Sequence, residues 1–137
     1  MWWIYALLSA VFAALTAIFV KLGVKNIDPD LATAIRTIII LFLSWGMVFY
    51  KGIAKTFPAL STNNWFFLIL SGLATGLSWI FYFRAIQVGK VSQVALVDKL
   101  SVALVLIFAA LFLGEHLTPK VLLGASLIIA GTIVMIA

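Results

Sequence analysis

The chain has 137 residues, of which 66% are hydrophobic and only 9% are charged, and its formal net charge is +5 at pH 7. A domain of this size cannot bury so much apolar surface in one core, so the composition excludes a soluble globular protein and indicates that lipid is the solvent. The sequence contains no cysteine, which excludes disulfide bonds and thiolate chemistry.

Five apolar segments follow one another along the chain, and each approaches the roughly 20 residues that a helix needs to cross a bilayer. They cover about residues 2–22, 30–50, 65–87, 91–113 and 119–136. Helix-start signals precede or open the last four, at Asp28, Ser61, Ser92 and Thr118. We therefore predict an all-α integral membrane protein, a five-transmembrane-helix bundle that forms one domain over residues 1–137. The connections are short and leave no room for a soluble domain, a nucleotide-binding loop or a metal site.

The first predicted helix begins with Trp2, Trp3 and Tyr5, which are typical of the aromatic belt at a membrane interface. It lacks the basic region of a signal peptide, so we expect it to remain in the protein. Ser9 and Thr16 lie along one side of this helix. We predict that these two hydroxyl side chains line a solute cavity.

The third predicted helix has a polar face, which we call the polar stripe. A rotation of about 100° per residue places three hydroxyl and two aromatic side chains in one sector, namely Ser71, Thr75, Ser78, Trp79 and Tyr82. Rings and hydroxyls suit an amphiphilic organic solute, so the polar stripe predicts a substrate-binding face. The alternative is that small residues, together with Gly72 and Gly76, allow close helix packing. Arg84 falls off the polar stripe, and we expect it to anchor the helix at the interface.

The fourth predicted helix contains an adjacent acid and base, Asp98 and Lys99, on its inward side. Neighbouring side chains diverge by about 100°, so we expect these two not to pair with each other. A charge at the centre of a transmembrane helix costs about 2.5 to 3.5 kcal/mol, which favours a partner or a water-filled surrounding. In one interpretation, Asp98 forms a structural ion pair with Arg36 of the second helix while Lys99 reaches the interface. In the other, Asp98 and Lys99 line a cavity, where they bind solute or carry a coupling proton.

Basic residues are almost evenly distributed between the two faces of the membrane. Five crossings place Lys51, Lys55 and Lys120 on the amino-terminal side and Lys21, Lys25 and Lys90 on the other. Arg36 and Arg84 lie nearer to the second side, so the count is three basic residues against three to five. This small difference gives only a weak signal for the orientation of the chain in the membrane. This weak bias motivates the hypothesis that the chain inserts in both orientations and that two copies form an inverted repeat. A single orientation with a weak signal is the alternative.

The carboxyl-terminal half contains a series of short motifs, namely RAIQVG at 84–89, VSQVA at 91–95, LGEHLT at 113–118, LGA at 123–125, and Gly131. Together these motifs resemble the EamA domain of the drug/metabolite transporter superfamily. The resemblance implies a basket of helices around a central cavity and secondary transport, often export, of metabolites or drugs. Most members resemble two such five-helix units fused as inverted repeats, so this chain corresponds to one half of an inverted-repeat transporter fold. Asp98 and Lys99 stand where the family commonly has a proline.

Two functions follow from these observations. The first is a secondary transporter that exports a small organic metabolite or drug-like solute, works by alternating access as an antiparallel homodimer, and resides in a bacterial inner membrane. The second is a non-transporting membrane subunit that completes or stabilises another complex through its glycine-rich last helix, where Gly124 and Gly131 predict close packing. The spans carry no set of nucleophile, base and orienting acid, so we do not expect an enzyme. We expect no cofactor, no metal and no nucleic acid partner; the expected partners are the lipid bilayer, a small organic solute and a second copy of the chain.

Overall fold

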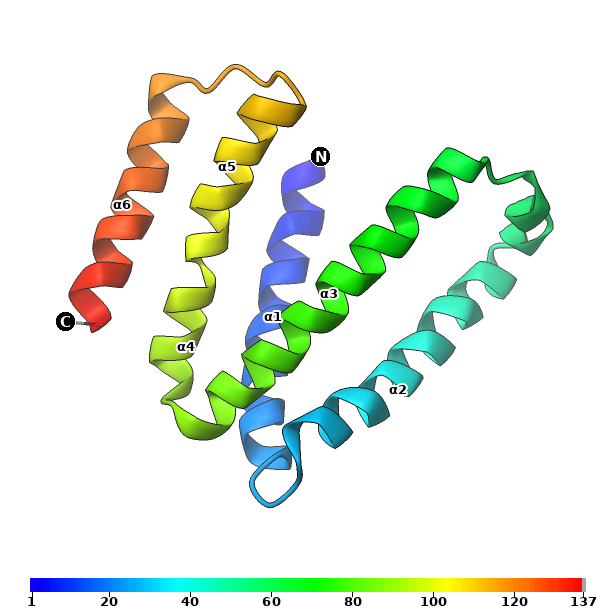
Figure 1. Ribbon diagram of the computed structural model, residues 1–137, viewed down its shortest axis with the longest axis horizontal. Helices are drawn as coiled ribbons and strands as arrows, with labels where there is room; N and C mark the ends of the chain where they lie inside the picture. Colours follow the sequence, from blue (N-terminus) through cyan, green and yellow to red (C-terminus); the bar gives the residue numbers. More distant parts are fainter. Residues whose placement is uncertain (137) are drawn as a thin grey trace. The chain divides into compact units, whose positions relative to one another are not determined.

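A computed structural model describes residues 1–136; Ala137, the last residue of the predicted domain, lies outside the described residues. The chain forms α1 (Trp2–Gly23), α2 (Pro29–Tyr50), η1 (Ile53–Ala59), α3 (Thr62–Val88), α4 (Val91–Asp98), α5 (Leu100–Phe112) and α6 (Pro119–Ile136) (Figure 1). Five helical stretches are long and apolar enough to cross a membrane, with α4 and α5 together forming the fourth. The prediction of an all-α membrane protein with five spans is confirmed, and its helix bounds agree to within a few residues.

Most of the predicted helix-start signals act as N-caps. The Asp28 carboxylate accepts hydrogen bonds from the backbone N–H groups of Asp30 (2.9 Å) and Leu31 (3.3 Å), with Pro29 at the first helical position of α2. The hydroxyls of Ser61 and Thr118 accept in the same way at the starts of α3 and α6. The Ser92 signal is wrong, because Lys90 is the N-cap residue of α4 and Ser92 lies within its first turn.

Two connections contain glycines that have left-handed backbone conformations. Gly52, with a φ of 67°, separates α2 from η1, and Gly114, with a φ of 66°, follows the end of α5. Side chains with a Cβ rarely adopt this conformation, so glycine allows the chain to leave a helix sharply. The short helix η1 was not predicted from the sequence. It packs the ring of Phe57 against Trp45 of α2 and Trp65 of α3, at centroid distances of 6.0 and 5.3 Å.

The chain divides into two compact units. The hairpin unit comprises Phe19–Gln87, in which α2 and α3 run antiparallel and are joined by η1 (Figure 1). The terminal unit comprises Met1–Ile18 together with the residues from Val88 onward, in which α4 and α5 pack against α6.

The fourth span is interrupted at Lys99, between α4 and α5. The backbone N–H of Lys99 donates to the carbonyl of Leu96 at 3.1 Å, three residues back, instead of continuing the regular α-helical pattern. The predicted unbroken helix over 91–113 is therefore wrong at this one residue, although the segment still forms a single crossing. The interruption lies directly at the adjacent acid and base of the span.

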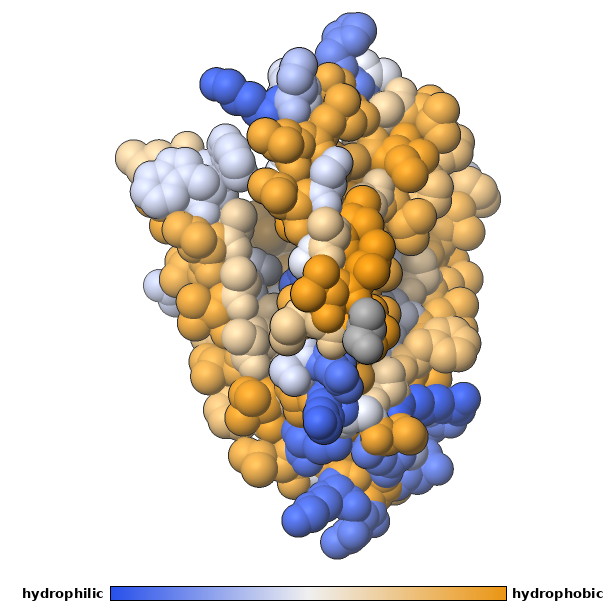
Figure 2. Space-filling model, turned by 90° about the vertical axis from the view of Figure 1, so that its left-hand side faces the viewer, coloured by the Kyte–Doolittle hydropathy of each residue, from blue (hydrophilic) through white to orange (hydrophobic). Residues whose placement is uncertain are grey.

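Most of the large apolar side chains are exposed. Figure 2 shows apolar residues over most of the visible face, with hydrophilic residues gathered in a few clusters. Among residues 1–136, the largest side chains that are less than 2% exposed are those of Phe83, Ile86 and Thr132. Lipid tails are as apolar as these surfaces, so the exposed side chains are compatible with a bilayer and with further subunits.

Candidate functional site

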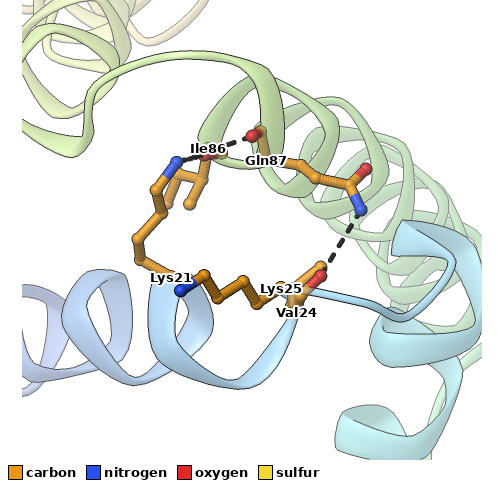
Figure 3. A pocket seen from close by; sticks show the side chains of 5 residues that line it. All are labelled: Lys21, Val24, Lys25, Ile86 and Gln87. Atoms are coloured by element: carbon orange, nitrogen blue, oxygen red, sulfur yellow. Dashed lines mark hydrogen bonds between the residues drawn. The ribbon is translucent and has the colours of Figure 1, made fainter.

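Lys21 connects the last turn of α1 to the end of α3, and Gln87 connects the end of α3 to the segment that links α1 and α2 (Figure 3). The Lys21 ammonium donates to the carbonyl of Ile86 at 2.7 Å, and the Gln87 amide donates to the carbonyl of Ile27 at 3.0 Å and to that of Val24 at 3.4 Å. These bonds satisfy carbonyls at helix ends, where a cation is also favoured by the helix dipole.

The space enclosed at this junction is small. Its volume is about 60 Å³, and it is lined by Lys21, Val24, Lys25, Ile86 and Gln87 (Figure 3). Ligand pockets typically enclose about 300 to 1,000 Å³, so this space is too small for an organic solute. We interpret the junction as structural.

Arg84 and Asp30 link α3 to the first turn of α2. Arg84 Nη2 lies 2.6 Å from Asp30 Oδ2, and Arg84 Nε donates to Oδ1 at 3.2 Å, which is the bidentate geometry of an arginine–carboxylate pair. Both side chains are about half exposed, so solvent screening makes the pair a weak contributor to stability. The sequence predicted Arg84 at the membrane interface but not its partner. The acid in the first turn of α2, Asp30, was the sequence feature that could have indicated this partner.

Arg36 lies against two aromatic rings of α3. Its guanidinium carbon is 4.6 Å from the ring centroid of Trp79 and 4.8 Å from that of Phe83, which are cation–π distances. Phe83 is almost completely buried and Arg36 is half buried. The structure thus joins one member of the predicted polar stripe, Trp79, to the arginine of the second span.

The hydroxyl members of the polar stripe remain on the exposed surface of α3, and Tyr82 is half buried. Thr75 donates its hydroxyl to the carbonyl of Ser71 at 2.8 Å, one turn earlier, and so satisfies its donor within the helix. A Cβ built on Gly72 or Gly76 meets no atom of the hairpin unit within 4 Å apart from its own helix and immediate neighbours, so the close packing considered for this face does not occur within that unit.

Asp98 and Lys99 contact each other in the terminal unit. Lys99 Nζ lies 3.8 Å from Asp98 Oδ2, and the two side chains are 56% and 41% exposed, respectively. The expectation that these neighbours do not pair is wrong, because the flexible lysine side chain reaches around the turn to the carboxylate although the backbone at Lys99 stays right-handed helical. Asp98 and Arg36 belong to different units, so their ion pair stays a prediction.

Lys99 also lines an open cavity beside α6. The cavity has a volume of about 420 Å³, and its walls are almost entirely apolar, with Leu96, Val102, Gly131, Thr132 and Met135 among the residues that form them. This volume lies within the range of small-molecule sites. The close packing predicted from Gly124 and Gly131 is not seen within residues 1–136, because Gly131 faces the cavity and neither glycine has another helix within 4 Å of its Cβ position.

Thr132 was missed as a cavity residue. It is 1% exposed and donates its hydroxyl to the carbonyl of Ile128 at 2.8 Å, with Leu96 O at 3.4 Å. The only feature of the sequence that could have indicated this role is a single hydroxyl residue next to Gly131 in an otherwise apolar stretch. The predicted residues of α1 lie in the terminal unit, with Ser9 exposed and Thr16 half buried. Within residues 1–136, no three His, Cys, Asp or Glu side chains are grouped so as to hold a metal ion.

Comparison with known proteins gives a consistent picture. All 137 residues match the EamA-like transporter family. A Sinorhizobium protein named "Uncharacterized transporter in cobO 3'region" is 48% identical over 134 residues, which cover 98% of this chain and 95% of that protein. The Bacillus subtilis (strain 168) protein named "Uncharacterized transporter YxxF" is 26% identical over 134 residues, which cover 93% of this chain and 40% of that protein. No solved structure matches the chain.

Proposed function

Because the chain belongs to the EamA-like transporter family, we propose that it exports a small organic metabolite or drug-like solute across a bacterial inner membrane. The interruption of the fourth span at Lys99 is the observation that carries this proposal. Binding sites of secondary transporters are typically formed by discontinuous transmembrane helices, whose broken segments free polar groups for solute and coupling ions. Here the break coincides with an acid, a base and a cavity of about 420 Å³.

The residues proposed to serve the solute come from three spans. The break contributes Asp98 and Lys99, and the polar stripe and α1 contribute Ser71, Thr75, Ser78, Trp79, Tyr82, Ser9 and Thr16. Asp98 is the proposed coupling group, because a carboxylate can exchange a proton as the site changes its exposure. Coupling to a proton gradient would make the protein a secondary transporter.

We further propose that one five-helix domain, residues 1–137, works with a second copy in the opposite orientation. The Bacillus protein is long enough for two such segments, whereas the Sinorhizobium protein matches one over nearly its whole length. The balanced basic residues are compatible with insertion in both orientations. The glycine faces of α3 and α6 are open in the described chain and would allow close contact with a second copy. Two oppositely oriented copies would supply the inverted repeat that alternating access requires.

The orientation of the carboxyl terminus tests this assembly. A dual reporter fused after residue 137, with one half active only in the cytoplasm and the other only outside, should give comparable signals from both halves in the same cells. A control fusion to a membrane protein of fixed orientation calibrates the two activities. A signal from one half alone would contradict the antiparallel homodimer, and would direct attention to an oppositely oriented partner or to the accessory-subunit role.

The polar stripe makes a separate prediction. Trp79→Ala and Tyr82→Ala should each weaken solute binding roughly two- to tenfold, because aromatic contacts contribute about 0.5 to 1.5 kcal/mol beyond simple burial. Leu73→Ala and Ile80→Ala on the same helix should change affinity much less. Equilibrium binding to purified protein measures this difference, and equal effects of all four substitutions would mean that the face serves packing and not recognition.

A further inference from the structure

The Arg36 guanidinium is a membrane-embedded cation whose hydrogen-bond donors have no acceptor within the hairpin unit, Phe19–Gln87. It is the eighth residue of α2, which places it about 10 Å along the helix axis from Pro29. Its contacts are the rings of Trp79 and Phe83 and an electrostatic interaction with Tyr82. The two rings provide no hydrogen-bond acceptor oxygen to the guanidinium, and no carboxylate of the hairpin unit lies within 4 Å of it.

The carboxylates of the hairpin unit are already engaged. Asp28 caps the first turn of α2, and Asp30 holds Arg84 in a bidentate pair. The other acids of the chain, Asp98 and Glu115, lie outside this unit, and Asp98 contacts Lys99. The hairpin unit therefore positions a permanently charged donor group and leaves its counter-ion position open.

The rings of Trp79 and Phe83 make the Arg36 guanidinium suitable for binding an anion. Cation–π contacts hold the guanidinium in place without using its N–H donors, and Phe83, at 1% exposure, provides a rigid support. A guanidinium in a surrounding of low polarity binds oxyanions strongly, and its fork of N–H groups matches the two oxygens of a carboxylate. The adjacent aromatic and hydroxyl side chains suit a partly apolar body.

We propose that Arg36, held by Trp79 and Phe83, binds the carboxylate of the transported solute, so that the solute class is an amphiphilic organic anion. This inference rests on the proposed transport function and specifies its substrate. A phosphate of an anionic lipid has similar chemistry and is the competing source of the oxyanion.

Matched probes test the charge preference directly. Radiolabelled 3-phenylpropionate and 3-phenylpropylamine share an aromatic body and differ in charge, and equilibrium dialysis against the full chain in phosphatidylcholine nanodiscs at neutral pH measures both. The wild-type protein should bind the carboxylate at least about tenfold more tightly than the amine, because charge-assisted hydrogen bonds contribute about 1.5 to 3 kcal/mol. Equal affinities, or a preference for the amine, would overturn the proposal without the use of any variant.

Substitutions assign the preference to Arg36. Arg36→Gln should weaken 3-phenylpropionate binding about tenfold and leave amine binding unchanged, whereas Arg36→Lys, which keeps the charge but loses the fork, should weaken it less. Lys55→Gln removes one positive charge in η1 and serves as the matched control. Unchanged carboxylate binding by Arg36→Gln would overturn the assignment. The assignment would also be overturned if neither probe binds and native mass spectrometry detects phosphatidylglycerol that the wild type retains and Arg36→Gln loses. In that case the oxyanion bound by Arg36 is a lipid phosphate.

Uptake into proteoliposomes, corrected for leakage into protein-free liposomes, separates this inference from the proposed function. Transport of the amine but not the carboxylate would preserve the transporter and overturn the anion site. Binding of the carboxylate through Arg36 without transport of either probe would support the anion site and contradict transport by the protein alone.

Discussion

Asp98→Asn should abolish the solute accumulation that a pH gradient drives, while leaving membrane expression intact. A gradient of one pH unit supplies about 1.4 kcal/mol per proton, so one coupled proton supports about tenfold accumulation, and the variant should fall to about onefold. The physical reason is that asparagine keeps the size and the acceptor of aspartate but cannot exchange a proton. Uptake into proteoliposomes with and without the gradient, at clamped membrane potential, measures the effect.

Glu115→Gln is the matched control for this prediction. Glu115 is an exposed acid in the connection before α6, and its neutral variant should keep the full response to the gradient. Unchanged pH dependence in Asp98→Asn would show that Asp98 is not the coupling group.

If Asp98 is instead the ion-pair partner of Arg36, single neutral substitutions at either residue should destabilise the protein, and the double substitution should recover much of the loss. Additive losses would exclude that pair.

Phe83→Ala should destabilise the protein by about 2 kcal/mol, mainly through the loss of packing contacts around a ring that is 1% exposed. The same change in a water-soluble core costs about 3 to 5 kcal/mol, because there the transfer of the side chain from water also contributes. In a bilayer the unfolded helix remains in lipid, so the cavity is the main effect. Reversible unfolding in mixed micelles measures this free energy.

Phe81→Ala provides the comparison on the same helix. Phe81 is 64% exposed and loses few protein contacts when truncated, so its substitution should change stability by less than about 0.5 kcal/mol. Equal losses at positions 81 and 83 would mean that the hairpin unit does not pack as the structure shows. Because Phe83 also supports Arg36, its variant should weaken 3-phenylpropionate binding as well.

The five spans were predictable because each is specified by its own composition. A segment of about 20 apolar residues in lipid must be helical, since no water is available for an unbonded backbone. Local signals at Asp28, Ser61 and Thr118 also determined where three helices begin. The break at Lys99 was not predictable in the same way, because the span contains neither proline nor glycine at that position.

The candidate site was predicted only in part. Helical spacing identified the polar stripe of α3 and the acid and base of the fourth span, because spacing depends only on position along one helix. It could not show that Arg36 lies over Trp79 and Phe83, since this contact depends on how α2 faces α3. The Asp30–Arg84 pair joins residues that are 54 positions apart and was missed for the same reason.

The sequence by itself determined the solvent, the number of crossings and the residue types available to a polar site. These follow from hydropathy and from hydrogen bonding within each helix, which are local properties. The partners of the two arginines in the hairpin unit became known only from the packing of α2 against α3, because these contacts require side chains to meet across different helices. Arg84 meets Asp30, while Arg36 meets two aromatic rings and no carboxylate of this unit. That difference in partners underlies the proposed preference for an organic anion.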